Sequence, residues 1–180
     1  MKVAIDPGHG GKDPGAAKGD IQEKEVVMEI ADYLIDELQD KDYEVLRTRK
    51  KDKLIGLYHR PSMAHEWGAD IFVSLHINAA DNLAAKGTEV IYYKGQEESL
   101  ELAEAIQNEL VNSLNRPDRG VKPNKSFVVL EQCEFFEIPA VIVEPMFVTN
   151  EIERSMLGKK EYLILIAQAI FDGIEKYRKG

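Results

Sequence analysis

The segment Asp70-Ile71-Phe72-Val73-Ser74-Leu75 is an almost unbroken apolar run, and it leads directly into His76-Ile77-Asn78. A short run without alternating polar residues is typical of a strand that is buried on both faces, as in a parallel sheet. We therefore predict a buried strand over residues 70–75. Because open α/β sheets bind ligands beyond the carboxyl ends of their strands, His76 stands where function is expected.

On either side of this segment, short apolar runs alternate with stretches that repeat apolar residues at helical spacing. Helices are predicted over about 23–39, 54–67, a long segment that includes Leu100 to Leu114, and about 161–177. Strands are predicted over 3–5, 43–46, 70–75, 87–93, 127–130 and 140–143, with loops over 7–20 and 115–124. This order predicts a single α/β domain over residues 1–180, with a mostly parallel, twisted sheet of about six strands flanked by helices on both faces.

The bulk composition narrows the classes of function. The chain has 180 residues, of which 44% are hydrophobic, enough for one substantial core. With 23 basic and 32 acidic residues the net charge is −9, which argues against nucleic acid as a partner. The longest apolar stretch, Leu163 to Phe171, is far shorter than the roughly 20 residues that span a bilayer. The lone Cys133 excludes an internal disulfide and is expected to be buried.

Four side chains are expected at one edge of the sheet. His9 follows the first strand, His76 the third, and Glu144 ends the strand over 140–143. Glu23 opens a helix that starts from the same edge, since a parallel crossover leaves the carboxyl end of a strand. Two imidazoles, one carboxylate and an open fourth position form a recurrent catalytic zinc arrangement, and a further carboxylate beside it acts as general base.

Each of these residues also has an ordinary explanation. His9 is a loop residue, His76 fits a hydrogen-bonded core histidine, and Glu23 suits the positive end of any helix. Glu144 is less ordinary, because a carboxylate after Ala-Val-Ile-Val is costly to bury unpaired. The glycine-rich loop matches neither a dinucleotide nor a phosphate loop, since Asp13 stands where either needs another residue. Its glycines are better explained by a close approach of backbone to a ligand or metal.

The ordered motifs then indicate a family. They are Asp6-Pro-Gly-His9-Gly-Gly-Lys-Asp-Pro-Gly-Ala16, Glu23-Lys24, Thr48-Arg49, Ala69-Asp70-Ile-Phe-Val-Ser-Leu-His76-Ile-Asn78-Ala79, Arg119-Gly-Val-Lys122, Pro139-Ala-Val-Ile-Val-Glu144 and Phe147-Val-Thr-Asn150. Together they resemble the zinc-dependent N-acetylmuramoyl-L-alanine amidases of the Amidase_3 type, which cleave bacterial peptidoglycan. The resemblance covers essentially the whole chain.

The resemblance implies one Zn²⁺ per chain with His9, Glu23 and His76 as ligands and Glu144 as the catalytic residue. The implied reaction is hydrolysis of the amide between N-acetylmuramic acid and L-alanine, by a metal-activated water with a glutamate as general base. Two departures from the family pattern stand out. The loop after His9 is one residue shorter, which leaves Glu25 as a rival to Glu23. Met146 replaces the usual glycine before Phe147, and we expect this to alter substrate fit.

Supporting roles are left open by the sequence. Asp6, Ser74 and Asn78 either orient the ligands or make ordinary strand-end hydrogen bonds. Arg119 and Lys122 either meet carboxylates of the stem peptide or support their own loop. His59 and His65 fall on a predicted helix away from the strand ends, so we leave them out of the site.

The implied partner is peptidoglycan, with a wall-binding domain or regulator expected outside this chain. The first residues lack the length of a signal peptide, so we expect synthesis in the cytoplasm and action on the cell wall, released as a phage lysin is or as part of a secreted protein. Two alternatives remain at this point: a zinc peptidase that cuts within the stem peptide, and a wall-binding module without catalysis.

Overall fold

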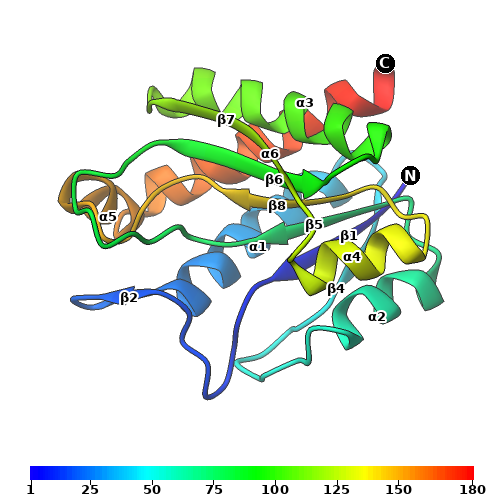
Figure 1. Ribbon diagram of the computed structural model, residues 1–180, viewed down its shortest axis with the longest axis horizontal. Helices are drawn as coiled ribbons and strands as arrows, with labels where there is room; N and C mark the ends of the chain where they lie inside the picture. The colour runs from blue at the N-terminus through cyan, green and yellow to red at the C-terminus, as the bar shows by residue number, and fades with distance from the viewer.

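A six-stranded sheet runs through the middle of the protein, whose computed structural model describes residues 1–180 as a single α/β domain (Figure 1). In spatial order its strands are β4 (Glu44–Arg47), β1 (Lys2–Pro7), β5 (Ile71–Leu75), β8 (Ala140–Glu144), β6 (Thr88–Tyr93) and β7 (Asp118–Asn124). Neighbouring strands pair in parallel, except that β8 and β6 are antiparallel. The predicted α/β class and mostly parallel sheet are confirmed.

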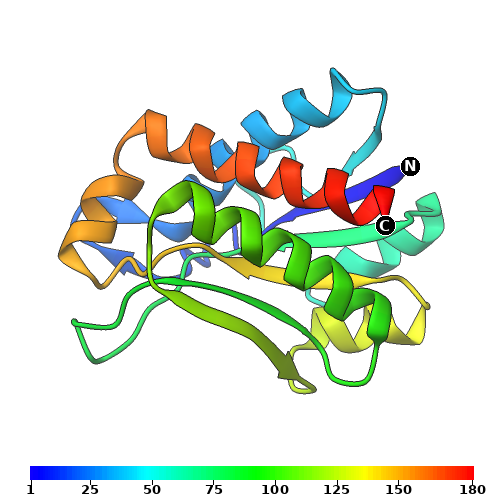
Figure 2. The same ribbon diagram turned by 90° about the horizontal axis from the view of Figure 1, so that it is seen from above.

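Helices cover both faces of the sheet (Figure 2). One face carries α1 (Glu23–Gln39), α3 (Glu97–Leu114) and α6 (Lys160–Lys179), and the other carries α2 (His59–Trp67) and α4 (Val128–Phe135). Side chains of a strand point alternately to the two faces. Val3 and Ile5 accordingly join a cluster of 31 buried residues under α1, α3 and α6, whereas Ala4 joins a cluster of 10 under α2 and α4.

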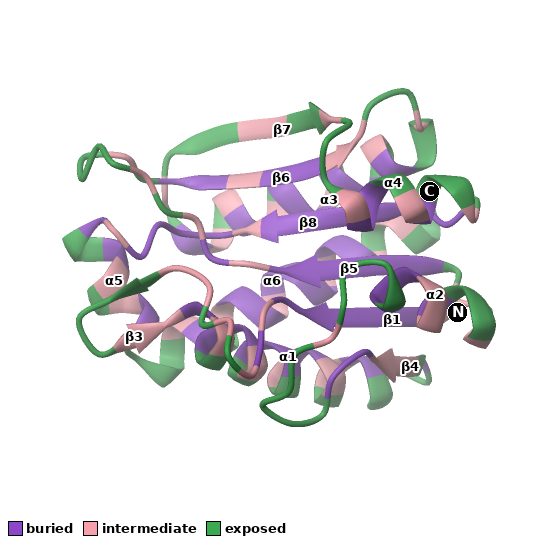
Figure 3. Ribbon diagram, turned by 60° about the horizontal axis from the view of Figure 1, so that its bottom comes forward, coloured by how far each residue is buried: buried purple, intermediate pink, exposed green.

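The central strands are buried and the edge strand β7 is not (Figure 3). All five residues of β5 are buried, as the continuous apolar run predicted. Cys133 is also buried, as expected, in the smaller cluster. No helix combines the length and the apolar composition that a membrane span requires.

The secondary structure predicted for two segments, 115–124 and 127–130, was wrong. Residues 127–130, predicted as a strand, are the N-cap and first turn of helix α4, where Leu130 and Cys133 share a buried face one turn apart. A short apolar run does not distinguish a strand from a buried helical turn. Residues 115–124, predicted as a loop, contain β7. A strand at the edge of a sheet tolerates Pro123 and is only partly buried, so it lacks the usual apolar pattern.

Other boundaries differ less. The second helix was predicted from residue 54 but begins at His59, since residues 51–58 form an extended loop and turn. Three short elements were not predicted: the two-stranded ribbon of β2 (Ala17–Lys18) and β3 (Ile21–Gln22), and helix α5 (Glu151–Leu157). Helix α1 occupies the predicted residues 23–39.

The topology brings several chain segments to one edge of the sheet. The parallel strands β1, β5 and β8 all end there, and α1 begins there. Strand β6 runs in the opposite direction, so β6 and its parallel neighbour β7 start at this edge (Figure 1).

Candidate metal centre and active site

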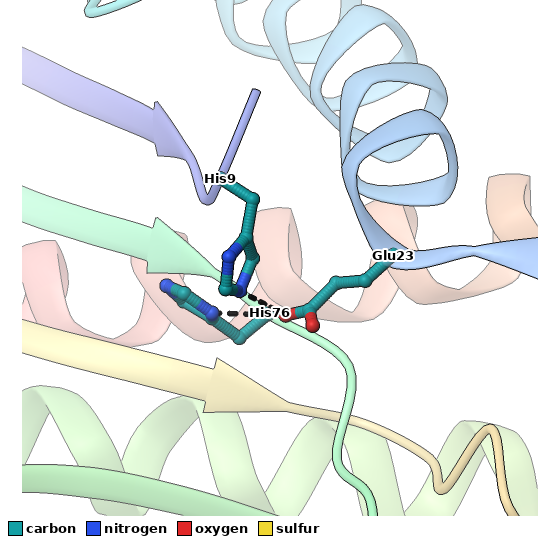
Figure 4. A group of neighbouring side chains, drawn as sticks. All are labelled: His9, Glu23 and His76. Atoms are coloured by element: carbon teal, nitrogen blue, oxygen red, sulfur yellow. Dashed lines mark hydrogen bonds and ion pairs between the residues drawn. The ribbon is translucent and has the colours of Figure 1, made fainter. Parts of the chain in front are cut away.

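Three side chains from three separate segments meet at this edge (Figure 4). His9 follows β1, Glu23 is the first residue of α1, and His76 follows β5. Each offers one ligand atom, and these atoms lie within 4.8 Å of one another. His9 Nε2 is 3.1 Å and His76 Nδ1 is 2.9 Å from the same oxygen, Oε1 of Glu23. The structure thus brings together the three residues that the sequence suggested as metal ligands.

The glycines of the first loop make this approach feasible. A Cβ atom on Gly8 would lie 2.5 Å from Cε1 of His76, so no side chain fits there. On Gly15, whose φ is +66°, a Cβ would lie 2.5 Å from Oε2 of Glu23 and 2.6 Å from Cδ2 of His9. These two positions show the close approach that the sequence suggested. His9 itself has a φ of 59°, which is uncommon outside glycine.

Glu23 is held as a buried anion. Its Oε2 accepts a hydrogen bond from the Ala16 amide at 2.7 Å, and its Oε1 accepts one from the Ile77 amide at 2.9 Å. Burial works to raise the pKa of Glu23, but its contacts with His76 and His9 outweigh burial and lower the pKa to about 2. The carboxylate is therefore ionised at any physiological pH. Glu25, the rival ligand, is exposed on the first turn of α1.

Asp13 orients the first imidazole. Its Oδ2 lies 2.9 Å from Nδ1 of His9, and its Oδ1 accepts a hydrogen bond from the Gly15 amide at 3.0 Å. Burial works to lower the pKa of His9, but Glu23 and Asp13 outweigh it and raise this pKa. Sequence reasoning missed this role, although a carboxylate four residues after a candidate ligand in a tight loop was a usable signal.

Glu144 ends β8 and lines the same cavity, of about 440 Å³, as His9 and His76. Burial, the negative charge of Glu89 and a hydrogen bond to Glu89 raise the pKa of Glu144 to about 8. The side-chain amide of Asn78 donates to both carboxylates, at 2.5 Å to Oε2 of Glu144 and 2.6 Å to Oε1 of Glu89. Asn78 therefore supports the candidate base and not the imidazoles.

Glu89 and Arg119 also lie next to Glu144. Arg119 had been singled out from the sequence, but Glu89 had not. Glu89 faces Glu144 directly across the antiparallel β6–β8 pair, and Arg119 Nε donates to Oε2 of Glu89 at 2.6 Å. The guanidinium of Arg119 also lies over the Phe147 ring, 4.8 Å from its centroid. Glu89 was overlooked because candidate residues were sought only at carboxyl ends of strands. The absence of a predicted helix between residues 75 and 87 was the clue that β6 runs the other way.

The remaining suggested residues take other positions. Asp6 is 1% exposed and accepts from Ser74 Oγ at 2.8 Å, so neither side chain contacts an imidazole. Lys122 is exposed on β7. His59 is exposed at the start of α2, and His65 stacks on Phe136, so both lie outside the metal-ligand group as expected.

One part of the cavity wall is apolar. It combines the 54–57 loop with the first turn of α4, and its large exposed side chains are Leu54, Leu57 and Phe127. A cavity with apolar walls and a few convergent polar groups is the usual form of a small-ligand site.

Comparisons with known proteins show which family the chain resembles over its whole length. The family described as N-acetylmuramoyl-L-alanine amidase matches residues 3–176. The uncharacterized protein YqiI of Bacillus subtilis is 36% identical, over 97% of this chain and 84% of YqiI. The N-acetylmuramoyl-L-alanine amidase LytC of the same organism is also 36% identical over 97% of this chain, which spans only 35% of LytC.

Solved structures extend the likeness to three dimensions. An N-acetylmuramoyl-L-alanine amidase from Clostridium difficile 630 superimposes with a TM-score of 0.93 at 34% identity, covering 99% of this chain and 97% of that one. The whole domain is therefore shared, not only the motifs. Since the family match runs from the first strand to the last helix, the chain belongs to the N-acetylmuramoyl-L-alanine amidase family.

Proposed function

We propose that this chain hydrolyses the amide bond between N-acetylmuramic acid and L-alanine in bacterial peptidoglycan. In this proposal His9, Glu23 and His76 hold one Zn²⁺ ion and Glu144 is the general base. The main support is the convergence of two imidazole nitrogens and one carboxylate oxygen within 4.8 Å of one another, beside a cavity that Glu144 also lines. Two histidines, a glutamate and an open position are a typical catalytic zinc donor set.

The donor atoms suit a zinc ion in charge and in orientation. Glu23 is ionised and held by two backbone amides, with its Oε1 next to both imidazoles. Asp13 engages Nδ1 of His9, which leaves Nε2 directed at the shared centre. Histidines that bind metals usually have such an acceptor on their other nitrogen. These features support the ligand set of His9, Glu23 and His76.

Held by His9, Glu23 and His76, a Zn²⁺ ion would supply Lewis acidity toward an amide carbonyl, lower the pKa of a bound water to about 7, and favour the ionised form of a nearby carboxylate. Glu144 accepts the proton of the attacking water and returns it to the departing amine. A carboxyl whose pKa is raised toward neutrality by burial and by Glu89 is suited to both transfers. Asn78 holds Oε2 of Glu144 in place during them.

The scissile bond joins the lactyl carbonyl of N-acetylmuramic acid to the amino group of L-alanine. The apolar wall formed by Leu54, Leu57 and Phe127 offers contacts to methyl groups and ring faces on either side of that bond. As a peptidoglycan hydrolase the chain acts on the cell wall, where a wall-binding domain or a regulator outside this chain would direct it.

The test is digestion of defined muropeptides by the zinc-loaded protein and by Glu144→Gln, followed by mass analysis of the products. The parent is expected to release peptides with a free L-alanine amino group, and chelation of zinc should abolish this release. Glu144→Gln should retain one zinc per chain and lose turnover by about 10²- to 10⁴-fold, because only the proton transfer is removed.

A matched pair of variants tests the metal ligands separately. Glu23→Gln should lose zinc, whereas Glu25→Gln, two residues further along α1 and exposed, should keep it. The proposal fails if Glu144→Gln digests muropeptides at the parent rate or if Glu23→Gln binds zinc as the parent does. Release of a different amine would indicate a peptidase acting within the stem peptide.

A further inference from the structure

Two buried arginines hold the backbone that carries His9. At the end of β1, the carbonyl oxygens of Pro7, Gly8 and His9 accept these arginine hydrogen bonds. Arg49 donates to Pro7 at 3.1 Å through Nε and to Gly8 at 2.9 Å through Nη2. Arg60 donates to Pro7 at 2.9 Å through Nη1 and to His9 at 2.7 Å through Nη2. Three successive carbonyls are thus fixed by side chains and not by secondary structure.

Arg60 occupies a place that is locally unfavourable for a cation. It lies in the first turn of α2, where the helix dipole repels positive charge, and its side chain is only 2% exposed. Burial of a charge is costly unless the charge is paired and hydrogen-bonded. The partner is Asp6, 2.7 Å away, which also accepts from Thr48 at 2.5 Å and from Ser74 at 2.8 Å.

His9 is the second local exception. Its φ of 59° is a left-handed conformation that histidine adopts only infrequently, at a cost of order 1–3 kcal/mol. Arg60 bonds the carbonyl of this same residue, at 2.7 Å. The buried cation of Arg60 and the left-handed backbone of His9 both depart from local preference, and one hydrogen bond joins them. Such departures are expected at functional sites more than in ordinary structural regions.

We propose that Arg60 is a positioning residue for the metal centre: anchored on Asp6, it fixes the backbone of His9 so that Nε2 faces Oε1 of Glu23, 3.1 Å away. This rests on the proposed metal site of His9, Glu23 and His76. It also gives Asp6 a role, because Asp6 contacts no imidazole and acts through Arg60. The same guanidinium donates from Nε to the Ile55 carbonyl at 3.1 Å, which ties the cavity wall to the metal ligand.

A flexible ammonium cannot replace this arrangement. The planar guanidinium reaches Asp6 and the carbonyls of Pro7, His9 and Ile55 together, from three nitrogens in a fixed fork. Lysine keeps the charge opposite Asp6 but offers a single nitrogen. Arg60→Lys should therefore preserve the buried ion pair while releasing the carbonyl of His9.

The experiment measures zinc affinity directly, by competition with a chromophoric chelator, for the parent and for Arg60→Lys. We expect Arg60→Lys to bind zinc about 10- to 100-fold more weakly, the usual effect of losing support for a metal ligand. The visible absorption spectrum of the Co²⁺-substituted protein should change as well, since it reports the coordination geometry. Arg47→Lys is the control, because the Arg47 side chain is 14% exposed but pairs with Asp32 and Met28 on α1, away from His9.

The outcomes separate this inference from the proposed function. If the parent does not bind one zinc per chain, the metal site itself is wrong. If the parent binds zinc and Arg60→Lys has unchanged affinity and an unchanged Co²⁺ spectrum, Arg60 is merely structural, whatever happens to the unfolding temperature. Should Arg60→Lys not fold, Asp6→Asn provides the second test, since it keeps the shape of the anchor but removes its charge. Parental zinc affinity in folded Asp6→Asn would overturn the inference.

Discussion

Glu89 and Glu144 are like charges placed directly opposite each other on antiparallel strands. Such a pair destabilises a sheet, so a structural explanation alone does not suffice. Asn78 bridges both carboxylates, and Arg119 neutralises one of them. The effect on Glu144 is a raised pKa, to which burial contributes most and Glu89 next, with Glu23 adding to the rise and Arg119 opposing it.

This balance predicts opposite pH effects for two single substitutions. Glu89→Gln removes a negative charge beside Glu144 and so lowers the pKa of Glu144. Because the base works only when ionised, the acid limb of the pH profile of kcat/KM should move to lower pH, by on the order of one unit. Arg119→Gln removes the cation that lowers the pKa, so the acid limb should move to higher pH. Both profiles are measured on a soluble muropeptide. Shifts in the same direction, or none in either variant, would contradict this electrostatic account.

The sequence could suggest those residues of the candidate site that directly follow a strand or open a helix. His9, His76 and Glu144 each follow an apolar run, and Glu23 opens a periodic helix, so their shared edge followed from the parallel topology. Asp13, Arg60 and Glu89 could not be placed in the same way. Their roles depend on loop geometry and on the reversed direction of β6, for which the sequence offers only indirect signals: the spacing of Asp13 from His9 and the missing helix before β6.

At the level of elements, the long periodic helices and the buried strands were predictable, and the short edge elements were not. Helix α1 and strand β5 carry strong patterns over many residues. Strand β7 is held by backbone pairing to β6 with little burial, and α4 starts with β-branched residues that favour a strand in isolation. Tertiary packing, and not local preference, fixes the structure of these two segments.

Helices α3 and α6 pack in direct contact where Gly173 faces the backbone of Ile106. A Cβ atom there would lie 2.6 Å from Cα and 2.9 Å from the backbone nitrogen of Ile106. In an exposed helix Gly→Ala stabilises by up to about 1 kcal/mol. Here we expect Gly173→Ala to lower the free energy of unfolding by about 1–3 kcal/mol, because the two helices must separate. Urea unfolding of the metal-free protein measures this directly.

Ile164→Ala on the same helix is the control for that substitution. Ile164 is 41% exposed, so its truncation should change the free energy of unfolding by less than about 0.5 kcal/mol. A rise in the urea midpoint of Gly173→Ala would show that α3 and α6 are not as close as the structure places them.

For the whole molecule, the proposed metal site would couple ion binding to stability. Its three proposed ligands come from the loop after β1, the start of α1 and the loop after β5, so an ion bound by all three would link segments far apart in the chain. The unfolded chain holds no such site. Zinc should therefore stabilise the folded protein as a whole, by about 2.7 kcal/mol when free zinc is 100 times its dissociation constant.

The stabilisation by zinc should increase with pH, because a protonated imidazole cannot bind a metal. In the metal-free fold, Glu23 and Asp13 raise the pKa of His9 above 6.5 despite its burial. The proton on His9 thus stabilises the metal-free fold below pH 6.5, and this contribution is lost as pH rises through the raised pKa. We expect zinc to raise Tm by about 5–10 °C at pH 8 and by much less at pH 5. Calorimetry across this pH range checks the prediction. His65→Gln should keep the zinc-dependent rise in Tm, and His9→Ala should lose it. A rise in Tm that does not depend on pH, or that persists in His9→Ala, would place the bound zinc elsewhere on the molecule.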